Sequence, residues 1–405
     1  MGRAFGMRWV YYRTLNRTKA HDMNPASPAA AKHLAFTTFC QAIGEAGNAW
    51  QKRKAELLHL VDTKPLLLFG FGGKGQMLAH QIREIAGKEV TVFDTSAGKR
   101  EAARNQGFKT ITQFNPGDGA RWATVLGACQ AQFEQKATVQ QNFIYYQEAA
   151  NLLGAPHLAH LARDFESFIP CHLRDLYKTY LALHSASRER FLRVLCFRIS
   201  SDPAHLQPVR QPNSEMWLDI PGEFKNRNYN SFLDVGAFDG DTLRYFHQRF
   251  GCQRGIAVEA NPSLFDSIRK VARLYPRGID IMPKAAWSST TRLRFDEVRF
   301  GMIQVTESED GQLEAAPIDT YVHEPVDCLK MDIEGAESAA LAGSKEVLKK
   351  SRPDLAIAAY HRPEDLVVLY SQIVDKGYGD RDFTWNLGHY SDCLDDSIFY
   401  VTRNH

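Results

Sequence analysis

The chain has 405 residues, of which 44% are hydrophobic and 24% charged, a composition typical of a globular rather than a disordered protein. Its 49 Lys and Arg against 47 Asp and Glu leave a formal net charge of +2, without the basic excess of a nucleic-acid-binding protein. At about 150 residues per domain, this length predicts two or three domains.

The cysteines and the apolar segments bear on the cellular compartment. The 7 cysteines are scattered without a CxxC pair, which is typical of reduced thiols. No apolar run reaches the about 18 residues of a membrane span, and the N-terminal apolar stretch is too broken for a signal peptide. We therefore expect a cytoplasmic protein without membrane or nucleic-acid partners, and the sequence leaves its oligomeric state open.

The N-terminal half begins with a predicted arm over residues 1–64, where LAFTTFCQAIGEAGNAWQKRKAELLHLV has a broken amphipathic helical pattern. At Pro65 the pattern changes to the apolar run LLLFGFG, followed by a helical stretch and the strand-like EVTVFD. This βαβ opening predicts a Rossmann-like domain over 65–200, with a mainly helical extension after about residue 120.

A glycine-rich turn follows the first predicted strand of this domain. Gly70, Gly72 and Gly75 have the GxGxxG spacing, and Asp94 ends the next strand. In the dinucleotide fingerprint such glycines let a pyrophosphate approach the backbone, and the acid binds the ribose. These four residues are a predicted second nucleotide site, for a nucleotide or nucleotide-sugar. A Rossmann-like domain with an empty or degenerate site is the alternative.

Prolines interrupt the pattern in a predicted connector over 201–230, and strands and helices alternate over 231–405. The predicted strands are SFLDVG, GIAVEA, IDIMPKAAW, VDCLKMDI and DLAIAAYH, with helices after Gly240, Pro262, Gly335 and Pro363. The last two strands, FTWNL and SIFYVTR, are too close for a helical crossover and are expected to pair antiparallel. We expect an α/β fold with a doubly wound, mostly parallel sheet and a C-terminal antiparallel hairpin.

The second glycine-rich turn follows the strand SFLDV and has the opposite charge. Asp234 and Asp241 accompany Gly236 and Gly240, and Glu259 ends the next strand. Acids at the start of a helix repel a pyrophosphate but attract a cationic cofactor. S-adenosylmethionine carries a sulfonium and an ammonium and no phosphate, and Glu259 is placed to accept hydrogen bonds from its ribose hydroxyls. These five residues are therefore predicted to bind S-adenosylmethionine.

Five sequence blocks now make the second half recognisable. DVGAFDGDT, VEANP, PIDTYV, LKMDIEGAE and AAYHRPEDL, in that order, resemble the FkbM family of S-adenosylmethionine-dependent methyltransferases, from about Trp217 to the C-terminus. The resemblance implies a class I methyltransferase fold, usually with O-methylation of a sugar or natural-product hydroxyl, and an adenine contact at Ala285. The chain also resembles the subgroup with an N-terminal Rossmann-like domain, except that Gly388 stands where that subgroup often has Arg.

Three side chains at strand ends are the predicted catalytic residues. Alternation places Asp332 and Glu334 on one side of their strand, with Lys330, unless these charges form an internal ion pair. Asp332 is expected closest to the donor methyl, orienting the substrate. Glu334 and His361 are expected to contact or deprotonate the acceptor hydroxyl. Such a cluster can also hold a divalent metal, but without tight ligand spacing in the sequence we predict none.

The function expected from these observations is methylation of a small-molecule or glycan acceptor. Two alternatives act through the Gly70 turn. One is an NAD(P)-dependent oxidoreductase, although the N-terminal half shows no recognisable hydride-transfer residues. The other is a nucleotide-sugar-binding module, which is compatible with methyl transfer in the second half. The sequence does not identify the acceptor, nor does it separate O- from N-methylation.

Overall fold

The computed structural model describes residues 28–115, 117–128, 131–153, 165–217, 227–298, 302–379 and 381–404. Parts of the predicted arm (1–27) and of the predicted connector (218–226) lie outside these ranges. The chain divides into two compact units. The first comprises Met1–Tyr180, Glu189–Arg210 and Ser391–Leu394, and the second comprises Leu181–Arg188, Gln211–Tyr390 and Asp395–His405. Within the described ranges, no helix has the combination of length and apolar character that crossing a membrane requires.

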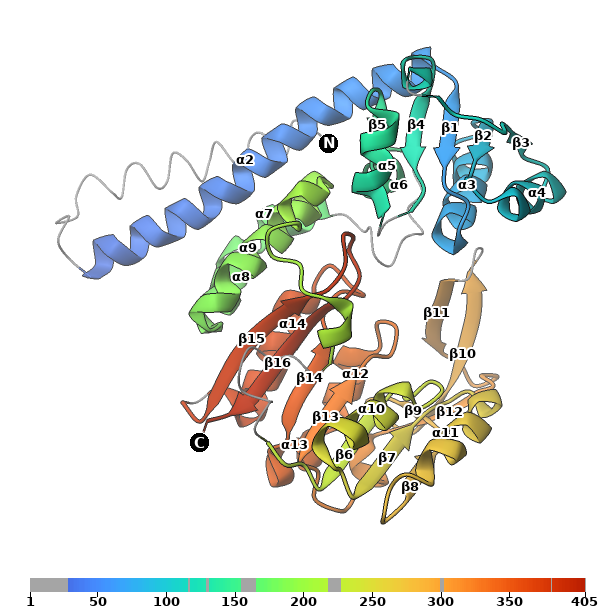
Figure 1. Cartoon of the computed structure of the whole chain (residues 1–405). Helices are drawn as coiled ribbons and strands as arrows, with labels where there is room; N and C mark the ends of the chain where they lie inside the picture. Colours follow the sequence, from blue (N-terminus) through green and yellow to red (C-terminus); the bar gives the residue numbers. More distant parts are fainter. Residues whose placement is uncertain are drawn as a thin grey trace. The chain divides into compact units, whose positions relative to one another are not determined.

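The first unit contains a five-stranded parallel sheet in the order β3-β2-β1-β4-β5 (Figure 1). Its strands are β1 (Leu66–Phe69), β2 (Val90–Phe93), β3 (Lys109–Thr110), β4 (Ala123–Leu126) and β5 (Phe143–Ile144). All four residues of β1 are buried, which is why that strand is uniformly apolar. The sequence analysis missed β3, β4 and β5, because strands of two to four residues show neither alternation nor length.

The helices of the N-terminal half are α2 (Pro28–Thr63), α3 (Gly73–Ile85), α4 (Ala97–Asn105), α5 (Gln132–Val139), α6 (Tyr146–Leu152), α7 (Phe165–Cys171), α8 (Leu173–Ala182) and α9 (Ser185–Ser200). In contrast to the predicted broken helix, α2 is one helix of 36 residues. Gly44 and Gly47 lower its intrinsic propensity. Trp50 and Leu57 are buried in the core beside Leu68, and this packing outweighs the propensity.

The glycines of the Gly70 turn differ in what they pack against. A Cβ on Gly75 would lie 2.2 Å from the Gly70 carbonyl oxygen, whereas a Cβ on Gly73 would meet nothing within 4 Å. We therefore expect Gly75→Ala to lower the free energy of unfolding by about 2 kcal/mol. Gly73→Ala is expected to be neutral or stabilising by about 0.5 kcal/mol. Urea unfolding of the full chain measures both, and equal effects would contradict the close approach.

The second unit contains a seven-stranded sheet in the order β15-β16-β14-β13-β6-β7-β8. Its strands are β6 (Ser231–Val235), β7 (Arg254–Val258), β8 (Ile279–Met282), β13 (Cys328–Met331), β14 (Asp354–Ala358), β15 (Phe383–His389) and β16 (Ser397–Arg403). β16 runs antiparallel to both β14 and β15, and the other pairs are parallel. The predicted mostly parallel sheet with a C-terminal antiparallel hairpin is confirmed.

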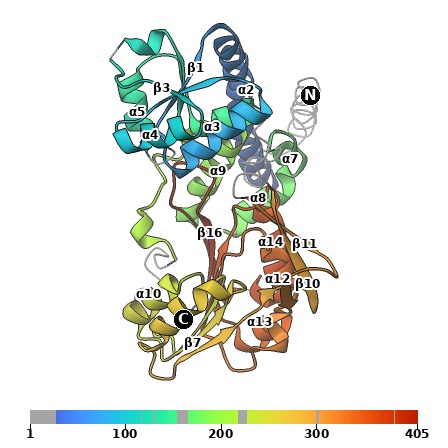
Figure 2. The ribbon, with the colours of Figure 1, turned by 90° about the vertical axis from the view of Figure 1, so that its right-hand side faces the viewer.

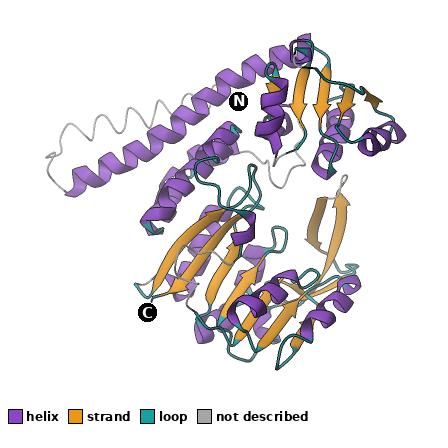
Figure 3. Cartoon of the chain, viewed as in Figure 1, coloured by secondary structure: helices purple, strands orange, loops and turns teal. Residues whose placement is uncertain are grey.

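Helices cover both faces of this sheet, as the predicted doubly wound architecture requires (Figure 3). They are α10 (Asp241–Phe250), α11 (Phe265–Ala272), α12 (Glu337–Ala342), α13 (Lys345–Ser351) and α14 (Asp365–Ile373). α10 lies on one side of the sheet, and α12, α13 and α14 lie on the other (Figure 2). The strand order reverses between β6 and β13, so the loops that follow these strands open a crevice at their carboxyl ends.

A smaller mixed sheet, in the order β11-β10-β12-β9, belongs to the same unit. It contains β9 (Ala285–Ala286), β10 (Thr291–Val298), β11 (Met302–Glu307) and β12 (Leu313–Ala316). The segment IDIMPKAAW, predicted as one strand, is divided between β8 and β9. Pro283 lies at the break, where its missing N–H and fixed φ disfavour a continuous strand. The segment after residue 299 supplies β11 and β12, and 299–301 lie outside the described residues.

Gly388 in β15 has a packing role. A Cβ at this position would lie 2.5 Å from the Tyr390 hydroxyl oxygen. That hydroxyl is hydrogen-bonded to the Tyr400 hydroxyl at 2.7 Å, and both side chains are buried. A larger side chain at position 388 therefore requires this tyrosine pair to move.

Candidate active site

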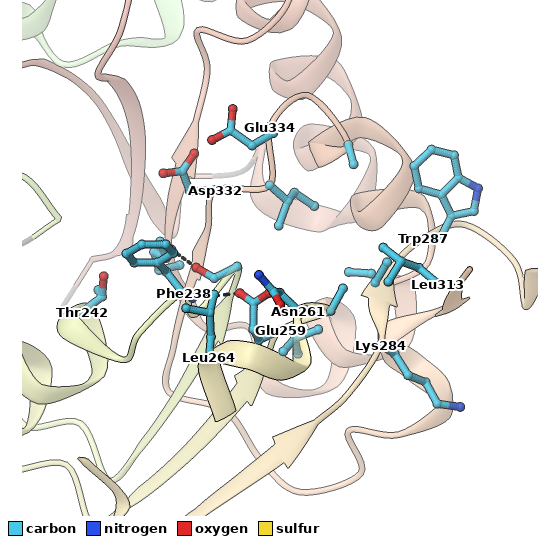
Figure 4. Close-up of a pocket in the computed structure, with 18 of the residues that line it drawn as sticks. Phe238, Thr242, Glu259, Asn261, Leu264, Lys284, Trp287, Leu313, Asp332 and Glu334 are labelled. Atoms are coloured by element: carbon cyan, nitrogen blue, oxygen red, sulfur yellow. Dashed lines mark hydrogen bonds between the residues drawn. The ribbon is translucent and has the colours of Figure 1, made fainter. Parts of the chain in front are cut away.

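A cavity of about 720 Å³ lies in the second unit at the carboxyl ends of its strands. Six of the predicted site residues line it: Gly236, Asp241, Glu259, Ala285, Asp332 and Glu334. Asp234, Gly240 and His361 do not line it. Figure 4 shows Asp332 and Glu334 on one side of the cavity and Trp287 and Leu313 on another, with Glu259 between them. The cavity thus has an acidic end and an apolar end.

Gly236 and Gly240 shape the turn between β6 and α10, with φ values of +81° and +85°. A Cβ on Gly236 would lie 2.0 Å from the Asp332 carbonyl oxygen, and one on Gly240 would lie 3.1 Å from Val271 Cγ2. Both positions combine a left-handed backbone with close packing, so both need glycine. Phe238 between them also has positive φ, +47°, and is 59% exposed at the cavity.

A buried ion pair supports the turn from below. Lys330 Nζ lies 3.0 Å from Asp234 Oδ1 and donates a 2.6 Å hydrogen bond to the Gly236 carbonyl oxygen. Burial raises the pKa of Asp234 to about 6, although Lys330 opposes the rise. Burial by itself lowers the pKa of Lys330, but Asp234 and Asp332 outweigh it and raise that pKa. Asp234 therefore does not line the cavity itself but contacts Lys330, which does.

Glu259 follows β7 and binds the two turns beside the cavity. Its Oε2 accepts a 2.9 Å hydrogen bond from the Phe238 N–H, and its Oε1 accepts one of 2.8 Å from the Asn261 N–H. Each carboxylate oxygen has a further lone pair, and the residue is only partly buried. Glu259 can therefore hold the turns and still accept two hydrogen bonds from a ligand.

The far end of the cavity is lined mainly by small and apolar side chains. Ala285 and Ala286 of β9 lie there with Leu313 of β12, and the charged Lys284 lies beside them (Figure 4). Trp287, which the sequence analysis left out, also lines the cavity, and its Nε1 donates a 2.5 Å hydrogen bond to Glu307 Oε1. Such a wall suits a flat heteroaromatic ring.

His361 is surrounded by carboxylates behind the acidic end. Its Nε2 lies 3.5 Å from Asp332 Oδ1 and 3.4 Å from Glu334 Oε2, and its Nδ1 lies 2.9 Å from Glu337 Oε1. The His361 side chain is 1% exposed. Burial lowers its pKa, but Glu337 above all, with Asp332 and Glu334, outweighs burial and raises the pKa to about 10. The structure thus brings all three predicted catalytic residues together.

Glu337, at the start of α12, is a site residue that the sequence analysis missed. It is fully buried, and its Oε1 also accepts a 2.9 Å hydrogen bond from the Ile333 N–H. The available signal was its place in the block LKMDIEGAE, of which Glu337 is the last residue and which also contains Asp332 and Glu334. Lys330 was placed with those two carboxylates by strand alternation. The structure pairs it with Asp234, a partner on the neighbouring strand that the sequence analysis did not consider.

The predicted nucleotide residues of the first unit lie together around the Gly70 turn. Asp94 Oδ2 accepts a 2.7 Å hydrogen bond from the Phe71 N–H, and its Oδ1 accepts one of 2.8 Å from the Ser96 N–H. This pattern repeats that of Glu259 in the second unit. Unlike Glu259, however, Asp94 is buried, with an exposed fraction of 6%. Lys74, in the same glycine-rich turn, has its Nζ 3.5 Å from Cys393 Sγ.

Comparison with known proteins assigns a family model to the second unit. The model described as "Methyltransferase FkbM domain" matches residues 234–380. The fold is similar to the crystal structure of methyltransferase FkbM from Methylobacillus flagellatus KT. That match has 19% identity and a TM-score of 0.72, and it covers 91% of this chain and 100% of that chain. No curated protein matches the chain.

Smaller parts of the chain match other solved methyltransferases. A SAM dependent methyltransferase from Aquifex aeolicus matches at 15% identity and a TM-score of 0.28, over 49% of this chain and 98% of that chain. Precorrin-6y C5,15-methyltransferase from Geobacter metallireducens GS-15 matches at 11% identity and a TM-score of 0.28, over 48% of this chain and 97% of that chain.

Proposed function

From the premise that residues 234–380 are an FkbM methyltransferase domain and that the chain is an S-adenosylmethionine-dependent methyltransferase, we propose that it methylates a hydroxyl oxygen. The proposed acceptor is a sugar-containing molecule or a natural product. The observation that carries the proposal is the pair of carboxylates, Asp332 and Glu334, at one end of the cavity. Carboxylates at this place can accept hydrogen bonds from acceptor hydroxyls and take up the proton that O-methylation releases.

The residues around the cavity fit S-adenosylmethionine. Ala285 and Leu313 suit the adenine ring, and Glu259 suits the ribose hydroxyls. The acids at the other end, with Asp241 at the start of α10, suit a cationic sulfonium and ammonium. When bound, this cofactor supplies a methyl group on a positively charged sulfur. These residues would hold the cofactor between the apolar wall and the acidic end of the cavity, where Asp332 and Glu334 lie.

In the proposed reaction the acceptor oxygen bonds to the methyl carbon while the carbon–sulfur bond breaks and its electron pair stays on sulfur. The hydroxyl proton passes to Glu334, whose side chain is 62% exposed and lines the cavity. Asp332 orients the hydroxyl, since its Oδ1 is itself held by a 3.2 Å hydrogen bond from the Tyr360 hydroxyl. His361 does not line the cavity, and its Nε2 lies 3.4–3.5 Å from the two carboxylates.

The test is methyl transfer to a panel of acceptors in matched pairs. The full chain is incubated with S-adenosylmethionine labelled in its methyl group and with sugars, nucleotide-sugars and polyols. Each acceptor is paired with the analogue that has an amine in place of one hydroxyl. We expect label on a hydroxyl oxygen of at least one sugar-containing acceptor. Label on amines only, from a protein that binds S-adenosylhomocysteine, would overturn O-methylation while leaving the methyltransferase assignment in place.

Cofactor binding gives a separate prediction at Glu259. Glu259→Gln keeps the size of the side chain but replaces one acceptor oxygen with an amide that opposes a backbone N–H. We expect about 10- to 100-fold weaker binding of S-adenosylhomocysteine in calorimetry, since charge-assisted hydrogen bonds are lost. Asp266→Asn, which changes an exposed acid paired with Arg269, is the control. Unchanged affinity in Glu259→Gln would remove Glu259 from the ribose site.

A nucleotide or nucleotide-sugar at the Gly70 turn stays a prediction. Support comes from the GxGxxG spacing and from the parallel sheet that carries it. The acid of the Gly70 turn, Asp94, accepts two backbone hydrogen bonds as Glu259 does, but it is buried whereas Glu259 is only partly buried. A ribose there must share these oxygens with Phe71 and Ser96. Calorimetry with NAD and with nucleotide-sugars tests the site independently of the methyltransferase domain.

A further inference from the structure

We propose that His361, Asp332 and Glu334 form a binding site for one divalent transition-metal cation at the acidic end of the methyltransferase cavity. One imidazole nitrogen and two carboxylates are a ligand set that suits cations such as Mn²⁺, Fe²⁺ or Zn²⁺. The sequence argued against a metal because these residues are not closely spaced along the chain. The fold brings them together at the ends of β13 and β14.

The first observation is the spacing around the Nε2 atom of His361. This nitrogen lies 3.5 Å from Asp332 Oδ1 and 3.4 Å from Glu334 Oε2, and it makes no hydrogen bond to any described residue. These separations are too long for good N–H···O hydrogen bonds. They lie at or just above the upper end of the distance between neighbouring ligands that are each about 2.1 Å from one cation, which is about 3.0–3.4 Å for octahedral to tetrahedral angles.

The second observation is the carboxylate that lies beside the opposite ring nitrogen. Nδ1 of His361 faces Glu337 Oε1 at 2.9 Å, and Glu337 is fully buried. Metal-binding histidines usually pair their other nitrogen with a carboxylate, which fixes the ring orientation and makes the ligating nitrogen more basic. The ligand atoms of Asp332, Glu337 and His361 all lie within 4.8 Å of one another, so among the described residues Glu337 is the carboxylate that groups with Asp332 and His361. Because it faces the opposite edge of the ring, we assign it to holding His361 rather than to the cation.

The third observation concerns access. His361 is 1% exposed and closes the back of the site, whereas Asp332 and Glu334 line the cavity. A cation bound by these three residues therefore has its remaining coordination positions towards the cavity, where a water or an acceptor hydroxyl can bind. Coordination withdraws electron density from that hydroxyl and makes it easier to deprotonate. The proposed site thus adds metal-assisted activation to the proposed O-methylation.

The experiment measures Mn²⁺ bound to the purified full chain by electron paramagnetic resonance, in titrations without any acceptor. We expect one Mn²⁺ per chain, and at least 10-fold weaker binding in Asp332→Asn and in Glu334→Gln. Both side chains are partly exposed, so these variants are expected to fold, which circular dichroism confirms. Glu346→Gln, an exposed acid paired with Lys350, is the control and is expected to bind Mn²⁺ as the wild type does.

Two outcomes overturn the proposal: no Mn²⁺ or Zn²⁺ bound by the wild type at millimolar concentration, or equal binding by the wild type and both ligand variants. The metal is measured without an acceptor, so an error about the acceptor class leaves this result unaffected. Binding of S-adenosylhomocysteine in the same samples shows separately whether the cofactor site is intact. A failure of the metal site and a failure of the proposed function are therefore distinguishable.

Discussion

Gly236→Ala is expected to lower the free energy of unfolding by about 3 kcal/mol and to abolish measurable binding of S-adenosylhomocysteine. The new Cβ would lie 2.0 Å from the Asp332 carbonyl oxygen and 2.9 Å from Ile333 Cγ2, so the turn must move away from β13. Overpacking costs about 1–3 kcal/mol, and a left-handed φ of +81° adds about 1–2 kcal/mol for a non-glycine residue. Urea unfolding and calorimetry measure the two effects.

Gly251→Ala is the matched control for this prediction. Gly251 also has a left-handed φ, +68°, but a Cβ there would meet nothing within 4 Å. Gly251→Ala is therefore expected to lower the free energy of unfolding by about 1 kcal/mol, the cost of a left-handed backbone for a non-glycine residue, and to leave cofactor binding unchanged. The difference between the two variants isolates the contact between the turn and β13. If both variants lost the same stability, that contact would not be the reason for glycine at position 236.

Lys330→Met is expected to lower the free energy of unfolding by about 3–5 kcal/mol at neutral pH. It leaves Asp234 fully buried without its counter-ion, and removing one partner of a buried pair leaves an uncompensated charge. The variant also loses the hydrogen bond to the Gly236 carbonyl oxygen. Replacing both partners, in Asp234→Asn with Lys330→Met, is expected to restore part of the loss because no charge remains buried.

The pH dependence of this loss has a defined sign. The pKa of Asp234 is raised by burial to about 6, above its ordinary value of 3.8, so the folded state holds its proton more tightly than the unfolded state. The contribution of Asp234 to stability therefore falls as pH rises from about 4 to about 6 and is constant above that. Without Lys330 the pKa rises further, so the loss in Lys330→Met should shrink as pH is lowered from 7. A loss that stayed constant from pH 7 to pH 4 would exclude Asp234 as its origin.

Several features of the second unit are determined by short stretches of sequence. The buried strand SFLDV, the glycines at positions 236 and 240 and the acid at position 259 are local signals of a strand, a tight turn and the end of the next strand. The order of such blocks identifies the family domain over 234–380 and predicts the parallel sheet with its terminal hairpin. These inferences succeed because each depends on backbone conformation and periodicity within a few residues.

What the sequence by itself determined is thus the architecture of the methyltransferase unit and six of the residues that line its cavity. The tertiary structure alone decided the pairings: Lys330 with Asp234, His361 with Glu337, and Asp94 with the backbone of its own turn. Charges and burial at these positions depend on which strands become neighbours, and Coulomb interactions act through space rather than along the chain. The ring of His361 acquires three carboxylate neighbours because β13 and β14 are adjacent, a fact that no spacing in the sequence encodes.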